Sequence, residues 1–274
     1  MGNTPSRRAR NWIWSGLMPA FQPDSFIAAD VVASPNQDER TNGRAPDLIL
    51  LHYTGMMDGQ SALERLCSAD SKVSSHYVAF EDGRIVQCVP ETRRAWHAGV
   101  SSWAGETDIN SCSIGIEIVN PGHDFGYPDF PRRQIAAVIA LCRSILARRG
   151  PISPDRVLAH SDVAPARKQD PGEKFPWDLL SQSGVGYWVP PAPLTIEGSS
   201  LRNGDTGENV AQLQLALSNY GYGVPATGVY DDTTREVVIA FQRHFRPARV
   251  DGIVDPSTLQ TLRALLETRP APFR

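Results

Sequence analysis

The 274-residue sequence predicts an α/β domain with a mixed β-sheet flanked by helices, followed by a small C-terminal three-helix domain. In the first two thirds of the chain, apolar runs of strand length alternate with a helical apolar period, which is typical of α/β domains. A hairpin signal in this part requires two antiparallel strands, so the sheet is expected to be mixed. Beyond a proline-rich stretch near residue 190, the apolar residues follow only a helical period.

Composition and charge exclude several classes of protein. Hydrophobic residues make up 41% of the chain and charged residues 21%, which supplies enough apolar material for packed cores. The 27 lysines and arginines are balanced by 30 aspartates and glutamates, which excludes a nucleic-acid binder that relies on phosphate neutralisation. No apolar run approaches the roughly 20 residues of a membrane-spanning helix, so we expect no transmembrane segment. The four cysteines form no CxxC pair and are interpreted as free thiols in the core.

The predicted strands are read from apolar runs and turn signals. Residues 47–53 form a continuous apolar run of strand length, as expected for a buried strand. Residues 75–80 and 85–89 flank an Asp-Gly pair, which predicts a hairpin. Residues 113–119 form another apolar strand, and residues 156–160 a short one that ends in a histidine. Together these segments account for the predicted sheet.

The helices and the domain boundary follow from periodicity and from proline. Residues 131–149 carry apolar side chains on one helical face, and Gly150 is a stop signal. After the proline-rich stretch, a turn followed by a helix start occurs twice, and in the second copy Asp255 is an N-cap with Pro256 at the first helical position. The chain is therefore divided into an N-terminal extension (1–44), an α/β domain (45–186), a linker (187–200) and a helical domain (201–268). We expect each part to fold on its own, with few contacts from the linker.

Two histidines and one aspartate form a candidate metal site. His52 and His160 each stand at the end of a predicted strand, and Asp170 lies in a Pro- and Gly-rich loop close behind the second. Two histidines and a carboxylate are the ligand set of an open catalytic zinc site, which keeps its fourth position for water. A histidine that closes a strand is also commonly a hydrogen-bonded structural residue. Spacing alone leaves both interpretations open.

A carboxylate in the strand 113–119 adds to this pattern. The isoleucines of the strand occupy one face, so Glu117 lies on the other. A carboxylate in so apolar a strand is costly unless it has a partner or a task. It could pair with Arg93 or Arg94, or it could serve as a general base for a water at the zinc. Lys168 is either a surface lysine or a cation that stabilises the oxyanion of a tetrahedral intermediate.

Several segments between about residues 45 and 180 occur in a recognisable order: LHYTG, SSHY, DGRIVQ, RRAWHAGVSSWAG, SIGIEIVN and AHSDVAPARKQDPG. Together they resemble the zinc-dependent N-acetylmuramoyl-L-alanine amidases of the amidase-2 group, which are similar in fold to phage lysozyme-type amidases and peptidoglycan recognition proteins. The resemblance implies a mixed sheet with helices packed on it. It also implies a set of functional residues: His52, His160 and Asp170 as zinc ligands, and Glu117 and Lys168 as catalytic residues.

Two further residues are placed near the substrate by the same resemblance. Trp96 and His97 lie in the cleft wall of similar proteins, and core packing is the alternative for Trp96. His76 is interpreted as a structural histidine, while His123 and His244 match nothing catalytic and are interpreted as surface or packing residues.

The C-terminal part, from residue 201 to about 266, resembles a small helical peptidoglycan-binding domain. The segments LRNGDTGENVAQLQLALSNYGY, TGVYDDTTREVVIAFQRHF and VDGIVDPSTLQTLRALL carry this resemblance. A binding domain tethered to a catalytic domain raises the local concentration of a polymeric substrate.

The sequence thus predicts a zinc hydrolase that cleaves the amide between N-acetylmuramic acid and L-alanine in peptidoglycan or muropeptides. A non-catalytic peptidoglycan-recognition protein is the alternative, and the complete set of five site residues favours the enzyme. A zinc peptidase acting within the stem peptide would use the same metal chemistry. The absence of a standard signal peptide favours the cytoplasm, whereas a wall-binding domain favours the periplasm or cell envelope. The sequence makes no prediction of oligomeric state or of preference for anhydro-muropeptides over intact wall.

Overall fold

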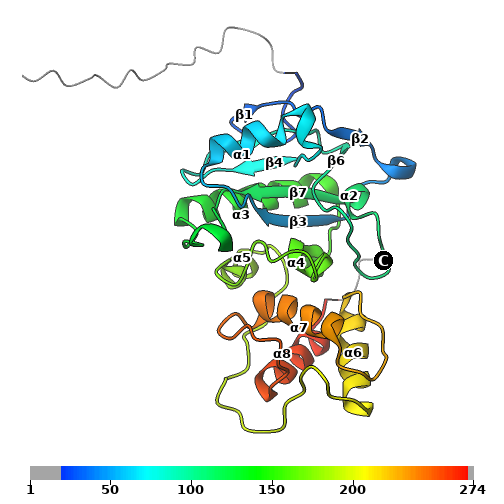
Figure 1. The fold of residues 1–274 in the computed structure, drawn as a ribbon. Helices are drawn as coiled ribbons and strands as arrows, with labels where there is room; N and C mark the ends of the chain where they lie inside the picture. Colours follow the sequence, from blue (N-terminus) through cyan, green and yellow to red (C-terminus); the bar gives the residue numbers. More distant parts are fainter. Residues whose placement is uncertain (1–19, 271–274) are drawn as a thin grey trace, which may run out of the picture.

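The computed structural model describes residues 20–270 and confirms the predicted fold class. A six-stranded mixed sheet with helices on both faces forms one part of the molecule, and a bundle of three helices forms the other (Figure 1). The residues from which a cytoplasmic location is predicted, 1–19, lie outside the described residues, so that location stays a prediction. Between residues 20 and 270, no helix combines the length and apolar character needed to cross a membrane.

The main sheet has the strand order β1-β5-β4-β7-β3-β8. All neighbouring strands are parallel except the β4–β5 hairpin, which confirms the mixed sheet. The strands span β1 Asp30–Val31, β3 Leu48–Tyr53, β4 Tyr77–Ala79, β5 Ile85–Gln87, β7 Ser113–Ile118 and β8 Val157–Ala159. A second sheet pairs β2 Gln37–Glu39 with β6 Arg93–Ala95 in antiparallel fashion. Strands β1 and β2 belong to the N-terminal extension, to which the sequence assigns no strand.

Helices cover both faces of the main sheet. The predicted long helix is α3, Arg132–Arg149, and its apolar face packs on the isoleucines of β7. Helix α1, Gly59–Leu66, packs through Leu63 and Leu66 on the opposite face. The remaining helices of this part are α2 Ile109–Cys112, α4 His160–Val163 and α5 Trp177–Gln182, with the 3₁₀ turns η1 Thr41–Gly43, η2 Ala69–Ser71, η3 His123–Phe125 and η4 Pro154–Arg156. Because the isoleucines of β7 face α3, Gly115 and Glu117 of this strand lie on the opposite face of the sheet.

The C-terminal module consists of α6 Glu208–Tyr220, α7 Asp232–Phe245 and α8 Pro256–Glu267. The Asp255 carboxylate accepts a hydrogen bond from the backbone N–H of Thr258, and Pro256 occupies the first turn. This confirms the helix start predicted from the sequence, because both signals act within one turn of the helix.

The module is packed against the α/β domain, although the sequence predicts that each part closes on itself. A continuous apolar cluster includes residues of β3 together with residues of α6 and α7. The buried Trp103 lies edge-on to Tyr220 and Tyr222, with ring centroids 5.7 and 5.0 Å apart. The predicted linker also contacts α8, because the Ser257 hydroxyl at the start of this helix donates to the Ala192 carbonyl at 2.6 Å. Apolar periodicity identifies buried residues but not the element they pack against, which is why the sequence missed this contact.

Candidate active site

Strand pairing places His52 beside Glu117. His52 lies on β3 and Glu117 on β7, and the two residues are direct partners in the parallel register of these central strands. Their side chains share the face opposite α3, because Ile116 and Ile118 point toward that helix. Buried parallel strands of this kind bring functional side chains together near their carboxyl ends.

His160 and Asp170 come from the segment that follows β8. The sequence places His160 at the end of a strand, but β8 ends at Ala159 and His160 is the first residue of α4. Asp170 lies ten residues further on, and its carbonyl accepts a hydrogen bond from the N–H of Ser161 at 3.0 Å. This backbone contact closes the segment on itself and brings the Asp170 carboxylate back to His160.

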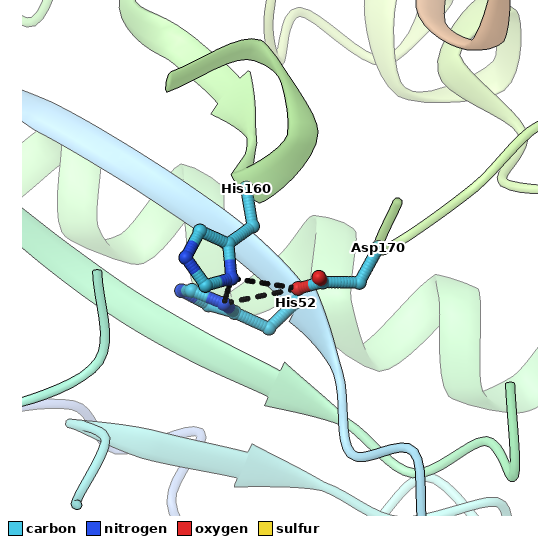
Figure 2. Close-up of side chains that lie close together, drawn as sticks. All are labelled: His52, His160 and Asp170. Atoms are coloured by element: carbon cyan, nitrogen blue, oxygen red, sulfur yellow. Dashed lines mark hydrogen bonds and ion pairs between the residues drawn. The ribbon is translucent and has the colours of Figure 1, made fainter. Parts of the chain in front are cut away.

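The three predicted zinc ligands converge on one point (Figure 2). His52 Nδ1 lies 2.9 Å from His160 Nδ1 and 3.2 Å from Asp170 Oδ2, and the last two atoms are 3.0 Å apart. All three residues are buried. Donor atoms at zinc distances of about 2.0–2.1 Å in a tetrahedral site lie roughly 3.3 Å from one another. The two nitrogens and one oxygen therefore fit a zinc ion in both spacing and donor chemistry.

The charge states of these groups also suit a metal. Burial, and after it the neighbouring His160, lowers the pKa of His52 to about 4, so its imidazole is neutral near neutral pH. Burial favours the neutral form of Asp170, but the two histidines outweigh it and hold the pKa of its carboxyl well below the ordinary value. Neutral imidazole and ionised carboxylate are the forms that bind metal.

Hydrogen bonds behind the ligands fix their tautomers. Ser113 donates to a backbone carbonyl and therefore accepts from His97 Nε2 at 3.2 Å, which leaves His97 Nδ1 to accept from His52 Nε2 at 3.1 Å. His160 Nε2 donates to the Ala98 carbonyl at 3.0 Å. Both histidines consequently direct the Nδ1 lone pair toward the point at which the three donor atoms converge.

Glu117 lacks the ion pair that the sequence left as one alternative. Within residues 20–270, Arg93 pairs with Glu39, whereas Arg94 pairs with Asp38 and Asp108. Glu117 Oε2 is buried and has no hydrogen-bond partner among these residues. Burial, and then the Asp170 carboxylate, raises the pKa of Glu117 well above its ordinary value, while Lys168 opposes the rise. A free carboxylate oxygen beside a metal position is suited to accepting a proton.

One cavity of about 470 Å³ brings all seven predicted site residues together. Its walls include the three metal-site residues and the other predicted ones, namely Trp96, His97, Glu117 and Lys168. Trp96 is held at the cavity wall by its indole N–H, which donates to Asp38 Oδ2 at 2.7 Å. The predicted structural role of His76 is confirmed, because it is fully buried and its Nδ1 accepts from the backbone N–H of Gly115.

The sequence assigns no role to several further residues at this cavity, of which three bear on its chemistry or geometry. Arg65 of α1 and Arg167 also line the cavity, and Arg167 donates to the carbonyls of Ala98 and Val100. The third is Gly115, where a Cβ would lie only 2.6 Å from the ring of His97. A glycine in an otherwise apolar strand is the signal that a side chain approaches the backbone closely.

Replacing Gly115 with alanine is therefore expected to displace His97 and weaken its bond to His52. Loss of such a support for a metal ligand typically reduces metal affinity or activity roughly 10–100-fold. Zinc affinity and kcat/KM measured on the same preparation would test this. Ile116→Val on the same strand is the control, because its side chain faces α3, and equal behaviour of the two variants would contradict the prediction.

Comparisons with known proteins identify the family of the chain. The N-acetylmuramoyl-L-alanine amidase family model matches residues 42–173, and a model described as a peptidoglycan binding domain matches residues 206–262. The chain is 41% identical over 235 residues to N-acetylmuramoyl-L-alanine amidase AmiD of Escherichia coli, covering 80% of this chain and 82% of AmiD.

The chain is also similar to several solved structures. AmpDh3 from Pseudomonas aeruginosa is 34% identical with a TM-score of 0.70, covering 84% of this chain and 94% of AmpDh3. AmiD from E. coli in complex with the substrate anhydro-N-acetylmuramic acid-L-Ala-D-γ-Glu-L-Lys is 37% identical with a TM-score of 0.68, covering 86% and 91%. The chain belongs to the N-acetylmuramoyl-L-alanine amidases and cleaves the amide bond between N-acetylmuramic acid and L-alanine in muropeptides or peptidoglycan.

Proposed function

We propose that the enzyme is a zinc amidase in which His52, His160 and Asp170 hold the metal. The convergence of their three donor atoms, at 2.9 to 3.2 Å from one another, carries this proposal. When bound, zinc would supply Lewis acidity that acidifies a water and polarises the scissile carbonyl.

Other residues of the cavity transfer the proton and stabilise the developing negative charge. Glu117 takes the proton of the attacking water on its free carboxylate oxygen and returns it to the leaving amine of L-alanine. The Lys168 ammonium, at the wall of the same cavity, stabilises the negative charge that develops on the carbonyl oxygen. Trp96 and His97 line the cavity beside the substrate, and His97 also orients His52 through its hydrogen bond.

The proposed substrates are anhydro-muropeptides and the intact wall polymer. The first is supported by the similar AmiD structure, which is a complex with the substrate anhydro-N-acetylmuramic acid-L-Ala-D-γ-Glu-L-Lys. The second is supported by the match of residues 206–262 to a peptidoglycan binding domain. We assign the wall contact to the helical domain, residues 201–268, because tethering increases the rate on a polymer with many sites.

Product analysis with and without a chelator tests this proposal. Purified protein is incubated with a soluble anhydro-muropeptide and with sacculi, and the products are identified by mass spectrometry. We expect peptides that begin with free L-alanine, their loss after chelation and their return with added zinc, whereas Asp170→Ala should stay inactive after zinc addition. Full activity after exhaustive chelation would refute the zinc site, and cleavage within the stem peptide would indicate a peptidase instead.

A further inference from the structure

The segment that carries two of the three proposed zinc ligands is held from outside by the C-terminal module. His52 is fixed by strand pairing in the centre of the sheet, but His160 opens a four-residue helix and Asp170 lies in the loop beyond it. Helix α7 of the module packs against α4, as Figure 1 shows. Two consecutive residues in the last turn of α7, Arg243 and His244, reach this segment.

His244 contacts the segment next to His160. Its Nδ1 lies 2.7 Å from Oδ2 of Asp162, and both side chains are buried. The same Asp162 oxygen accepts the backbone N–H of Ala159 at 2.8 Å, directly before His160. Tyr222, also from the module, donates to the other carboxylate oxygen at 2.7 Å. The carboxylate thus joins the first turn of α4 to two side chains of the module.

Among residues 20–270, Asp162 is the only polar partner of the His244 imidazole. The imidazole is stacked between Trp177 and Phe245, with ring centroids 3.8 Å away on each side. Its Nε2 is buried and has no hydrogen-bond partner within residues 20–270. A stacked ring held this firmly has one orientation, so its hydrogen bond fixes the position of Asp162.

Arg243 contacts the segment on both sides of Asp170. Its guanidinium donates to Oε1 of Gln169 at 3.2 Å, and its Nε lies 3.6 Å from Oε2 of Glu173. Glu173 in turn lies 3.1 Å from Nε2 of His123. The loop carrying the third proposed ligand is therefore attached to α7 through the residues before and after it.

We propose that Arg243 and His244 are positioning residues of the amidase reaction, through which the C-terminal module sets the placement of His160 and Asp170. This rests on the proposed zinc site. Short helices and loops have few internal restraints, and a site built on them depends on outside support to keep its geometry. The module then serves the catalytic centre directly, in addition to any contact with the wall.

Paired substitutions of His244 in the full chain test this proposal. His244→Phe keeps the stacked ring but cannot donate to Asp162, whereas His244→Asn restores a donor close to the Nδ1 position. Tyr222→Phe is a second, nearly isosteric removal of a hydrogen bond to the same carboxylate. Arg269→Met is the matched control, because Arg269 joins the two parts at Asp155 and Asn219, away from the ligand segment.

Three quantities are measured for each variant: zinc affinity by competition with a chromophoric chelator, kcat and KM on a soluble muropeptide, and hydrogen exchange of residues 160–173 in the metal-free protein. We expect His244→Phe to bind zinc about tenfold more weakly, as for other supports of metal ligands, and to exchange faster in this segment. Its kcat should fall while KM stays within about twofold, because the ligand geometry and not the substrate contacts changes. Tyr222→Phe should change zinc affinity, kcat and hydrogen exchange in the same direction. His244→Asn should recover most of the zinc affinity and kcat that His244→Phe loses.

Unchanged exchange of residues 160–173 in His244→Phe and Tyr222→Phe would overturn the proposal, whatever the zinc result. An equal loss of zinc affinity and kcat in Arg269→Met would also overturn the proposal. Packing of the module on the α/β domain in general, and not the contacts to residues 160–173, would then be responsible. Failure of the unaltered enzyme to bind zinc would count against the proposed metal site alone, because exchange is measured without metal.

Discussion

Replacing Glu117 with glutamine is expected to reduce kcat by a factor of about 100 or more, the usual contribution of a positioned general base. The amide keeps the shape of the side chain but cannot accept the proton of the attacking water. The fold and the zinc content should be retained, because Glu117 is not among the three converging donors and makes no ion pair within the described residues. Single-turnover kinetics on a soluble muropeptide, with zinc content measured on the same sample, would show this.

The exposed Glu64 on α1 is a suitable control, because Glu64→Gln is the same chemical change on the surface. Near-normal turnover of the Glu117 variant would leave its carboxylate with a structural role only.

The inactive Glu117→Gln variant also permits a test of wall binding by the C-terminal module, since this variant cannot digest the polymer to which it binds. Sedimentation with sacculi is the expected result, and a protein that stays in the supernatant would argue against a wall contact.

Truncation after Pro191 is expected to yield a protein that aggregates or melts far below the full chain. The cut would expose side chains of the α/β domain that now pack on the module, including the buried Leu48, Leu50 and Trp103. Each fully buried apolar side chain contributes about 1.5–3 kcal/mol by burial, and a whole domain is stable by only about 5–15 kcal/mol. The buried Asp162 would also lose both of its partners from the module.

Solubility and thermal melting monitored by circular dichroism would test the truncation. Trp103→Ala in the full chain is a milder form of the same change and is expected to lower the free energy of unfolding by about 3–5 kcal/mol. A truncated protein that melts like the full chain and hydrolyses a muropeptide equally well would restore the view of two independent domains.

Much of the fold and of the candidate site could be predicted from the sequence, because the relevant signals are local. The apolar runs of β3 and β7, the Asp-Gly turn of the hairpin and the cap at Asp255 act within a few residues. Alternation along β7 alone placed Glu117 opposite its isoleucines. Residue types and spacing make five of the site residues candidates, the family resemblance assigns their roles and adds Trp96 and His97, and all seven line the cavity.

Only the tertiary structure decided which of the alternatives for these residues holds. The arginines that could have neutralised Glu117 have other partners, and Gly115 is needed for His97 to reach His52. The support of the ligand segment by α7 joins residues 82 positions apart, as in the contact between His244 and Asp162. Periodicity and capping depend on residues that are neighbours in the chain. The contacts described above depend instead on how helices and strands pack on one another, and a single sequence carries no local signal of that packing.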